Sequence, residues 1–143
     1  MKPEILYNQT FSLKGSDFIN AGTVSLQIKK ILKEIGLSQE IIYRVAICCY
    51  EAEMNVIMYA DRADIDFTIT PEEIRIVFED KGKGIENIEL AMKEGFSTAT
   101  NAMRELGFGA GMGLPNIKKN SDEFKIESVV SKGTKLSIKI NLN

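Results

Sequence analysis

The sequence predicts an α+β fold, a two-layer sandwich in which one mixed, mostly antiparallel sheet carries helices on one face. Three observations predict it. Apolar residues recur with helical spacing over most of 16–61, and they alternate with polar residues in two pairs of segments, within 63–79 and 124–142. The stretch between these pairs contains shorter helical patterns. With 143 residues, the chain is expected to form a single domain, 1–143.

The first part of the chain is expected to form one strand and two helices. Residues 5–13 alternate between apolar and polar, which is typical of a half-buried strand. A helix is expected over 16–35, with Ser16 as its N-cap. Ser38 can cap a second helix that runs to about Asp61. This second helix is apolar over much of its circumference, so we expect it to be central.

Two β-hairpins are expected after the helices. Segments 63–70 and 74–79 alternate around a short turn, and so do segments 124–130 and 134–142. Between the hairpins, the pattern at about 86–93 predicts a short helix.

Composition and charge narrow the range of functions. The 18 basic and 20 acidic residues give a net charge of −2, so nucleic acid is not expected as a partner. No apolar run approaches the ~20 residues that cross a bilayer, so no membrane is expected either. Cys48 and Cys49 are adjacent, which is typical of a reduced, cytoplasmic chain rather than of a disulfide. The absence of histidine excludes Ser-His-Asp and Cys-His catalysis, histidine-ligated zinc and histidine autophosphorylation.

A carboxylate and a carboxamide share one face of the second helix. At 100° per residue, Glu51 and Asn55 lie about 40° apart and one turn from each other. An amide oxygen suits Mg²⁺ and a carboxylate can orient a hydroxyl or a water, so the two can share one ligand. The alternative is a polar pair on a solvated helix face.

Asp80 follows a strand and precedes two glycines, Gly82 and Gly84. The period of two puts Asp80 on the inner face of the sheet, where a carboxylate is costly without a partner. The exocyclic amine of adenine would be such a partner, and the glycines let the backbone turn close to a ligand. The alternative is a solvated strand end with a glycine turn.

A glycine-rich stretch, 107–113, leads into a helix that Leu114-Pro115 opens. Free backbone N–H groups beside a helix N-terminus suit a phosphate chain, although a flexible connector is the alternative. The stretch is neither a Walker A loop nor a Rossmann fingerprint. Thr134 shares a strand face with Leu136, so its hydroxyl could reach the same base as Asp80; the alternative is an ordinary strand threonine.

The order of these motifs resembles the GHKL ATPases and their Bergerat ATP-binding fold, over nearly the whole chain. Within that superfamily the chain is most similar to the free-standing anti-sigma-factor serine kinases of bacteria, in particular the stressosome switch kinases. The segments that carry this second resemblance are 94–98, 109–115 and 122–128. The first resemblance is carried by the N box (Glu51, Asn55), the G1 box (Asp80, Gly82, Gly84), the G2 box (Gly109, Gly111, Gly113) and Gly133-Thr134.

The resemblance implies ATP and Mg²⁺ as cofactors and a lid over the nucleotide at about 94–113. Asp80 would bind adenine N6 with Thr134 at the same edge, Asn55 would coordinate Mg²⁺, and Glu51 would be the catalytic base. The further nucleotide contacts that it implies are Gly82, Gly84, Ile85, Ser97, Thr98, Gly109, Gly111, Gly113 and Leu114. Lys93, Arg104 and Lys118 could contact the γ-phosphate, with solvated surface charges as the alternative.

The implied activity is that of a serine/threonine protein kinase that phosphorylates a STAS-type anti-sigma-factor antagonist or a similar regulator. A sigma factor or a phosphatase could also be a partner, and a homodimer stays open. The alternatives are an ATP-dependent binding switch without catalysis and a stand-alone ATPase.

Two features depart from the family pattern. Glu53 stands where small or apolar residues are usual and shares a helix face with Cys49, so it needs a buried partner or an interface. The segment 100–106 also lengthens the expected lid.

Overall fold

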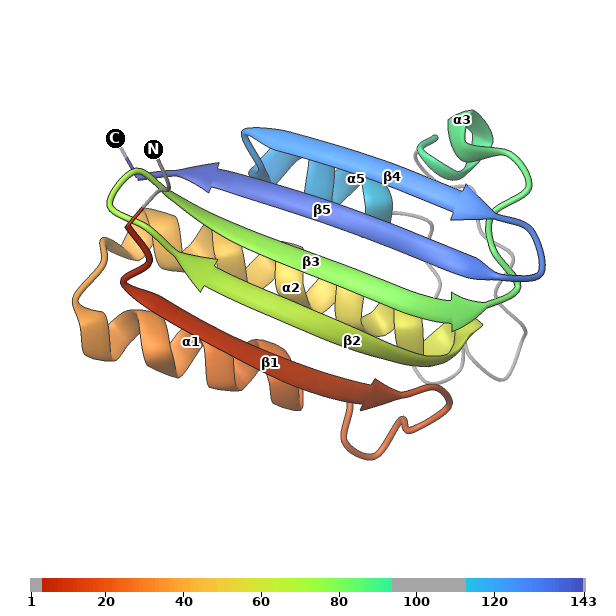
Figure 1. Ribbon diagram of the computed structural model, residues 1–143, viewed down its shortest axis with the longest axis horizontal. Helices are drawn as coiled ribbons and strands as arrows, with labels where there is room; N and C mark the ends of the chain where they lie inside the picture. Colours follow the sequence, from red (N-terminus) through yellow and green to blue (C-terminus); the bar gives the residue numbers. More distant parts are fainter. Residues whose placement is uncertain (1–3, 94–112, 143) are drawn as a thin grey trace.

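The structure is a two-layer sandwich with helices on one face of a single sheet (Figure 1). It is a computed structural model that describes residues 4–93 and 113–142. The strands follow the order β1-β2-β3-β5-β4. The elements are β1 (Tyr7–Lys14), α1 (Thr23–Ile35), α2 (Gln39–Tyr59), β2 (Ala60–Ile69), β3 (Glu73–Gly82), α3 (Ile88–Ala91), α5 (Gly113–Asn120), β4 (Glu123–Val129) and β5 (Gly133–Asn141). The predicted fold class, with α1, α2 and α5 behind the sheet, is confirmed.

The sheet is antiparallel at each of its four described pairings, whereas the sequence suggested a mixed sheet. Both predicted hairpins are present, as β2–β3 and β4–β5. The direction of β2 relative to β1 is set by the two helices that connect these strands. Because α1 leads away from the end of β1 and α2 leads back, β2 starts where β1 stops and must run antiparallel to it (Figure 1).

The core lies between the sheet and α2. The inner faces of β2, β3 and β5 alternate as predicted, and their apolar side chains are at most 3% exposed. On α2, both cysteines are fully buried and free. Burial raises the pKa of the Cys48 thiol to about 12 and also raises the pKa of Cys49, so both are protonated at neutral pH. Helix α2 is therefore the central helix that its apolar circumference predicts.

The predicted cap at Ser16 is wrong. Helix α1 begins at Thr23, and Ser16 has a left-handed backbone with φ of 63°. The local pattern failed because residues 15 and 16 are used to fasten the chain to the end of α2, where the N–H of Ser16 donates to the Ile57 carbonyl at 2.8 Å. By contrast, Ser38 caps α2 as predicted, since its side chain accepts from the N–H of Ile41 at 3.3 Å.

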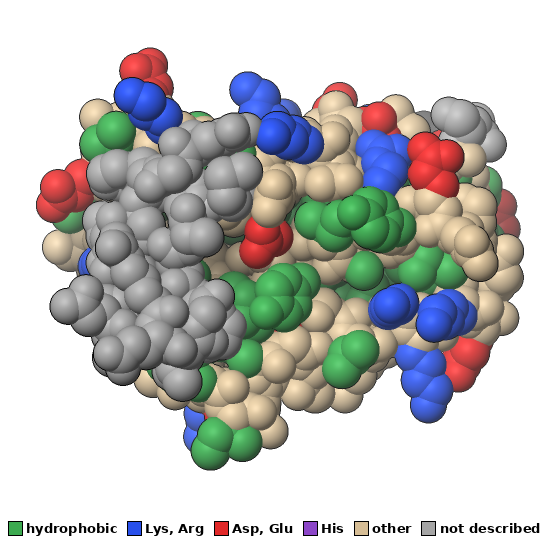
Figure 2. All heavy atoms as spheres, turned by 180° about the vertical axis from the view of Figure 1, so that it is seen from behind, with side chains coloured by type: hydrophobic (Ala, Val, Ile, Leu, Met, Phe, Trp, Pro, Cys, Tyr) green, Lys and Arg blue, Asp and Glu red, His purple; other side chains and the backbone are tan. Residues whose placement is uncertain are grey.

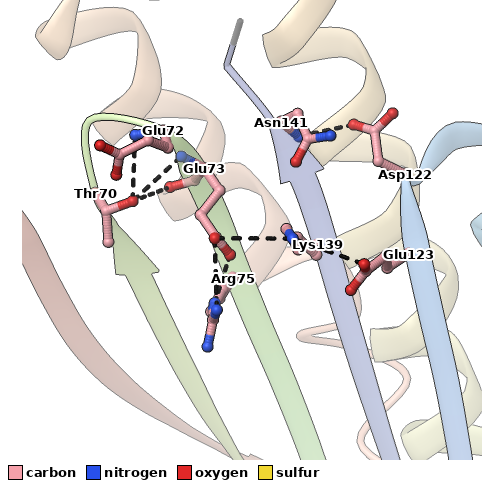
Figure 3. A network of polar contacts seen from close by, with 8 residues as sticks. All are labelled: Thr70, Glu72, Glu73, Arg75, Asp122, Glu123, Lys139 and Asn141. Atoms are coloured by element: carbon pink, nitrogen blue, oxygen red, sulfur yellow. Dashed lines mark hydrogen bonds and ion pairs between the residues drawn. The ribbon is translucent and has the colours of Figure 1, made fainter. Parts of the chain in front are cut away.

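A polar network closes the end of the sheet at the β2–β3 turn (Figure 3). Thr70 Oγ1 accepts from the N–H of Glu73 at 3.2 Å, and the Glu73 carboxylate pairs with Arg75 and, at 3.9 Å, with Lys139. The hydrogen bond from Arg75 is the main reason that the pKa of Glu73 is lowered. Asp80 and Thr134 lie at the opposite ends of β3 and β5, which makes that end of the sheet the place to look for the candidate site.

None of the helices in the described ranges, 4–93 and 113–142, has the length and apolarity that spanning a bilayer requires.

Candidate functional site

The candidate residues gather at one end of the sandwich. Helix α2 ends at Tyr59 and passes directly into β2 at Ala60, so its C-terminal half lies at the end of the sheet where β2 begins. In an antiparallel sheet of this order, β3 ends and β5 begins at that same end. The connectivity therefore brings Glu51 and Asn55 to the end that carries Asp80 and Thr134.

Asp80 and Thr134 are in direct contact. Asp80 Oδ1 accepts from the backbone N–H of Thr134 at 2.9 Å. Desolvation by burial raises the pKa of Asp80, and the hydrogen bond from Thr134 opposes that rise. The second carboxylate oxygen, Oδ2, has no hydrogen-bond donor within the described residues. One oxygen is thus fixed by the fold and the other is left for a ligand that donates, as an amine does.

The glycines beside Asp80 serve chain-to-chain packing. A Cβ added at Gly84, whose φ is +75°, would lie 2.5 Å from the Val129 carbonyl oxygen. A Cβ at Gly133 would lie 2.1 Å from the carbonyl oxygen of Asp80. Both distances are below any real contact, so only glycine lets β3 and the β4–β5 turn approach this closely. The described neighbours of Gly84 and Gly133 are thus the protein's own backbone, and the ligand contact expected at Gly82 and Gly84 stays a prediction.

Three hydrogen bonds connect segment 82–85 to the β4–β5 hairpin. Gly82 N–H donates to the Lys132 carbonyl at 3.3 Å, and Ser131 N–H donates to the Lys83 carbonyl at 2.8 Å. Ile85 N–H donates to Ser128 Oγ at 2.8 Å. These bonds fix the backbone that follows Asp80, here called the floor of the site.

Ser128 is a residue that the sequence patterns did not single out for a role. Besides accepting from Ile85, its hydroxyl lies 2.9 Å from Thr134 Oγ1 and 3.2 Å from the Gly133 carbonyl. Ser128 therefore joins the loop after β3 to the hydroxyl of Thr134. A single serine in a strand has no spacing signature, so the one sequence feature that pointed to it was its place in segment 122–128, which carries the family resemblance.

Glu51 is held by α5. Asn116 Nδ2 donates to Glu51 Oε2 at 2.6 Å. Helix α5 is itself fastened to α2, because Arg44 Nε donates to the Asn120 carbonyl at 3.0 Å and the Cys48 thiol contacts the Ile117 carbonyl at 3.7 Å. Asn116 was missed by the sequence patterns, although it lies only two residues beyond Leu114. The contact orients one Glu51 oxygen, and the other has no hydrogen bond within the described residues.

Asn55 is half-buried, and its side chain has no hydrogen bond to the described part of the chain. A free carboxamide oxygen on the helix face of Glu51 fits the ligand role for a hard cation such as Mg²⁺. No hydrogen bond among the described residues joins Glu51 or Asn55 to Asp80 or Thr134. The two pairs are therefore separate groups, and their contacts with a nucleotide stay a prediction.

The other predicted contacts divide between described and undescribed positions. Gly113 begins α5, and a Cβ added there would meet no atom of the described residues within 4 Å; Leu114 beside it is buried. Lys93 and Lys118 are exposed. Ser97, Thr98, Arg104, Gly109 and Gly111 lie outside the described residues.

Glu53 has the buried partner that its position requires. Its side chain is 0% exposed, and its carboxylate accepts three backbone hydrogen bonds from the start of α1. The donors are the N–H groups of Gly22 at 3.1 Å, Val24 at 3.2 Å and Ser25 at 2.9 Å. Glu53 is therefore the N-terminal cap of α1, supplied from another helix.

Comparison with known proteins identifies the family of this chain. The family model of the histidine kinase-like ATPase domain matches residues 16–140. The serine/threonine-protein kinase RsbT of Bacillus subtilis (strain 168) is 30% identical over 112 residues, which are 76% of this chain and 78% of RsbT. The anti-sigma F factor of Clostridium perfringens (strain SM101 / Type A) is 26% identical over 130 residues, which are 87% of this chain and 89% of that protein.

A solved structure has the same fold. The crystal structure of the RsbU and RsbW domains of Rv1364c from Mycobacterium tuberculosis superposes with a TM-score of 0.62 and 16% identity. The match covers 94% of this chain and 32% of that longer one. Because the family model spans most of the sequence and one relative shares 30% identity over three quarters of it, the chain belongs to the histidine kinase-like ATPase domain family, as its ordered motifs predict.

Proposed function

We propose that this protein binds Mg-ATP and transfers the γ-phosphoryl group to a serine or threonine of a regulatory protein partner of the STAS type. The observation that carries nucleotide binding is the Asp80–Thr134 pair, in which the fold fixes one oxygen of a half-buried carboxylate and leaves the other for a donor. Protein kinase activity is supported by the similarity to RsbT, a serine/threonine-protein kinase by name. Phosphorylation of the partner would then control transcription or stress signalling.

The described residues fit these ligands. Asp80 suits the amine of adenine, because an ionised carboxylate accepts and cannot donate. The side chain of Asn55 offers the oxygen that Mg²⁺ prefers, and the glycines around Asp80 keep the site floor tightly packed. Bound Mg-ATP supplies the phosphoryl group and the charge neutralisation that this chemistry requires.

Glu51 is the proposed base. Its Oε2 accepts the hydrogen bond from Asn116, so Oε1 is free to accept a proton. Oε1 takes this proton from the acceptor hydroxyl while the hydroxyl oxygen forms its bond to phosphorus. The bond between phosphorus and the bridging oxygen breaks, and ADP leaves. A positioned carboxylate contributes ~10²–10⁴ in rate to such a proton transfer. Asn116 acts by fixing the orientation of this carboxylate.

The test is phosphoryl transfer by Glu51→Gln. The protein is incubated with radiolabelled Mg-ATP and a STAS-domain regulator from the same genome, and label on serine or threonine is measured beside Mg-ATP affinity. We expect transfer to fall by ~10²-fold or more while affinity changes little. Glu40→Gln is the matched control, because Glu40 is an exposed carboxylate in the first turn of the same helix.

A second candidate function is a binding switch without catalysis, which the similarity to anti-sigma F factors favours. If the partner binds, ATP changes that binding and no label moves, the switch is correct and the kinase proposal is wrong. Label recovered only as free phosphate would identify an ATPase.

A further inference from the structure

Helix α2 has a second apolar face, directed away from the sheet. Tyr43, Ala46, Ile47 and Tyr50 follow the i, i+3, i+4, i+7 spacing of a helix-packing stripe. Tyr43 is 65% exposed and Tyr50 is 44% exposed, although the opposite face of the same helix fills the core. Large apolar side chains gathered on one surface mark interaction sites, and tyrosine is enriched where proteins bind each other.

The stripe forms the floor of a groove. The groove has a volume of about 1000 Å³ and lies between α1 and α5, whose side chains form its two rims. Figure 2 shows this side of the molecule, with apolar side chains along its middle and Lys and Arg side chains towards its margins. The stripe spans the eight residues from Tyr43 to Tyr50, so it is ~10 Å long and matches about two turns of a second helix.

The charges of the groove are uneven. Lys29 and Lys33 are one turn apart on α1, and both line the groove. Neither has an ion pair within the described residues. The single carboxylate among the described lining residues is Glu51, whose Oε2 already accepts from Asn116. The α1 rim therefore presents unneutralised positive charge beside an apolar floor, which favours an acidic partner.

One end of the groove is the proposed catalytic carboxylate. The lining runs from Leu37 and Gln39, between α1 and α2, to Glu51. A segment that fills the groove lies beside Glu51, where an acceptor hydroxyl has to be placed for phosphoryl transfer. The groove and the base are thus parts of one continuous surface.

We propose that this groove binds the protein substrate, and that its occupant is an amphipathic helix with apolar residues at i, i+3 or i+4 and i+7 and acidic residues along the edge that faces α1. This inference rests on the proposed function for the role of Glu51. The helix packs on Tyr43, Ile47 and Tyr50, and its acidic edge pairs with Lys29 and Lys33.

The experiment uses the whole protein and a designed helical peptide as probe. The peptide has leucines at the stripe positions and glutamates along one edge; a second peptide has lysines in place of those glutamates. Binding is measured by fluorescence anisotropy without nucleotide. We expect the acidic peptide to bind at least 10-fold more tightly than the basic one. Equal affinity, or binding of neither, would overturn the proposal.

Variants locate the binding. Tyr43→Glu and the double change Lys29→Glu with Lys33→Glu should each weaken the acidic peptide at least 10-fold, and the double change should make the basic peptide the better ligand. The matched controls are Leu26→Glu and Lys30→Glu, which make the same kinds of change on exposed positions outside the groove lining. Unchanged binding by the groove variants, or equal loss in the controls, would refute the assignment.

The oligomeric state and the nucleotide are measured separately. A dimer in light scattering that Tyr43→Glu converts to a monomer would show that a second copy covers the groove, which would also overturn the proposal. Mg-ATP affinity is determined by calorimetry on the same samples. If the protein fails to bind nucleotide, the proposed function fails, whereas the peptide result decides the groove on its own.

Discussion

Glu53 accepts a hydrogen bond of 2.9 Å from the backbone N–H of Ser25, and the two residues are 28 positions apart in the sequence. Its other oxygen accepts from Gly22 and Val24. The first turn of a helix leaves N–H groups without partners, and here a carboxylate from the central helix supplies all three acceptor contacts. A buried anion at a helix N-terminus is also favoured by the helix dipole. The contact therefore fixes where α1 starts and how it sits on α2.

Replacing Glu53 with alanine should destabilise the fold strongly. The substitution leaves buried N–H groups of α1 unpaired and opens a cavity beside Cys49, so we expect the free energy of unfolding to fall by about 2–4 kcal/mol. Urea denaturation followed by circular dichroism measures it. Glu34→Ala, on the exposed side of α1, should change it by less than about 0.5 kcal/mol. Equal effects of the two changes would contradict the capping role.

Ser128→Ala should loosen the floor of the site. The change removes the acceptor of Ile85 N–H and the partner of the Thr134 hydroxyl, and we expect a loss of about 1–2 kcal/mol in unfolding free energy. Nucleotide affinity should fall as well, and Ser128→Thr should restore part of both. Ser137→Ala is the control, because its hydroxyl has no hydrogen bond within the described residues. Full ATP affinity in Ser128→Ala would show that the hydroxyl does not organise the base site.

Asp80→Asn should weaken ATP binding and its preference over GTP. The amide can still accept from Thr134, but it can also present a donor towards the donor amine, so we expect a loss on the order of 1–3 kcal/mol in binding. Competition between the two nucleotides measures the preference. Asp64→Asn, an exposed position on β2, is the control. If GTP and ATP compete equally for the unaltered protein, Asp80 does not recognise the adenine base.

Asn55→Ala should weaken nucleotide binding only when Mg²⁺ is present. The substitution removes one oxygen ligand from an ion that requires near-octahedral geometry. Calorimetric titration with ATP, in Mg²⁺ and again with a chelator, compares the two proteins. The difference between them should be large in the first buffer and vanish in the second. A difference of the same size in both would mean that Asn55 contacts the nucleotide rather than the metal.

Acid should remove a contribution to stability that Asp122 makes at neutral pH. The N–H of Asn141, with Arg44 as a further partner, holds the pKa of Asp122 below its usual range. A carboxyl whose pKa is lower in the folded state stabilises that state above its ordinary pKa, and the contribution disappears as the pH falls through the lowered value. Asp122→Asn should therefore be less stable than the unaltered protein at pH 7, with the difference shrinking below pH 4. Melting temperatures across that range test it; a constant difference would refute the linkage.

The periodic parts of the fold were predictable from the sequence. Alternation identified the inner faces of β2, β3 and β5, because the positions that face the core must be apolar and recur at every second residue. Ser38 was predictable as a cap because its contact is local, with Ile41. The start of α1 was not, since its cap comes from Glu53 and no pattern near Ser16 records that contact.

The candidate site was predictable as a set of residues but not as a geometry. Glu51, Asn55, Asp80 and Thr134 carry spacing signals, and the structure places them at one end of the sandwich. Asn116 and Ser128 carry none, because each joins the site through a residue more than 40 positions away, Glu51 for Asn116 and Ile85 for Ser128. The packing role of Gly84 and Gly133 was equally hidden, since a glycine that meets backbone and one that meets a ligand look alike in sequence.

The central place of β5 in the sheet has a consequence for biosynthesis. The strand is the last of the described strands to leave the ribosome, yet it lies between β3 and β4. Until it emerges, the nascent chain carries β3 with an unpaired edge, a state prone to pairing with other chains. Asp80 must also wait for Thr134, 54 residues later, before its carboxylate gains a backbone donor. Nucleotide binding should therefore appear only after β5 has been synthesised. A chain that stalls or ends before Thr134 should not bind nucleotide, even weakly.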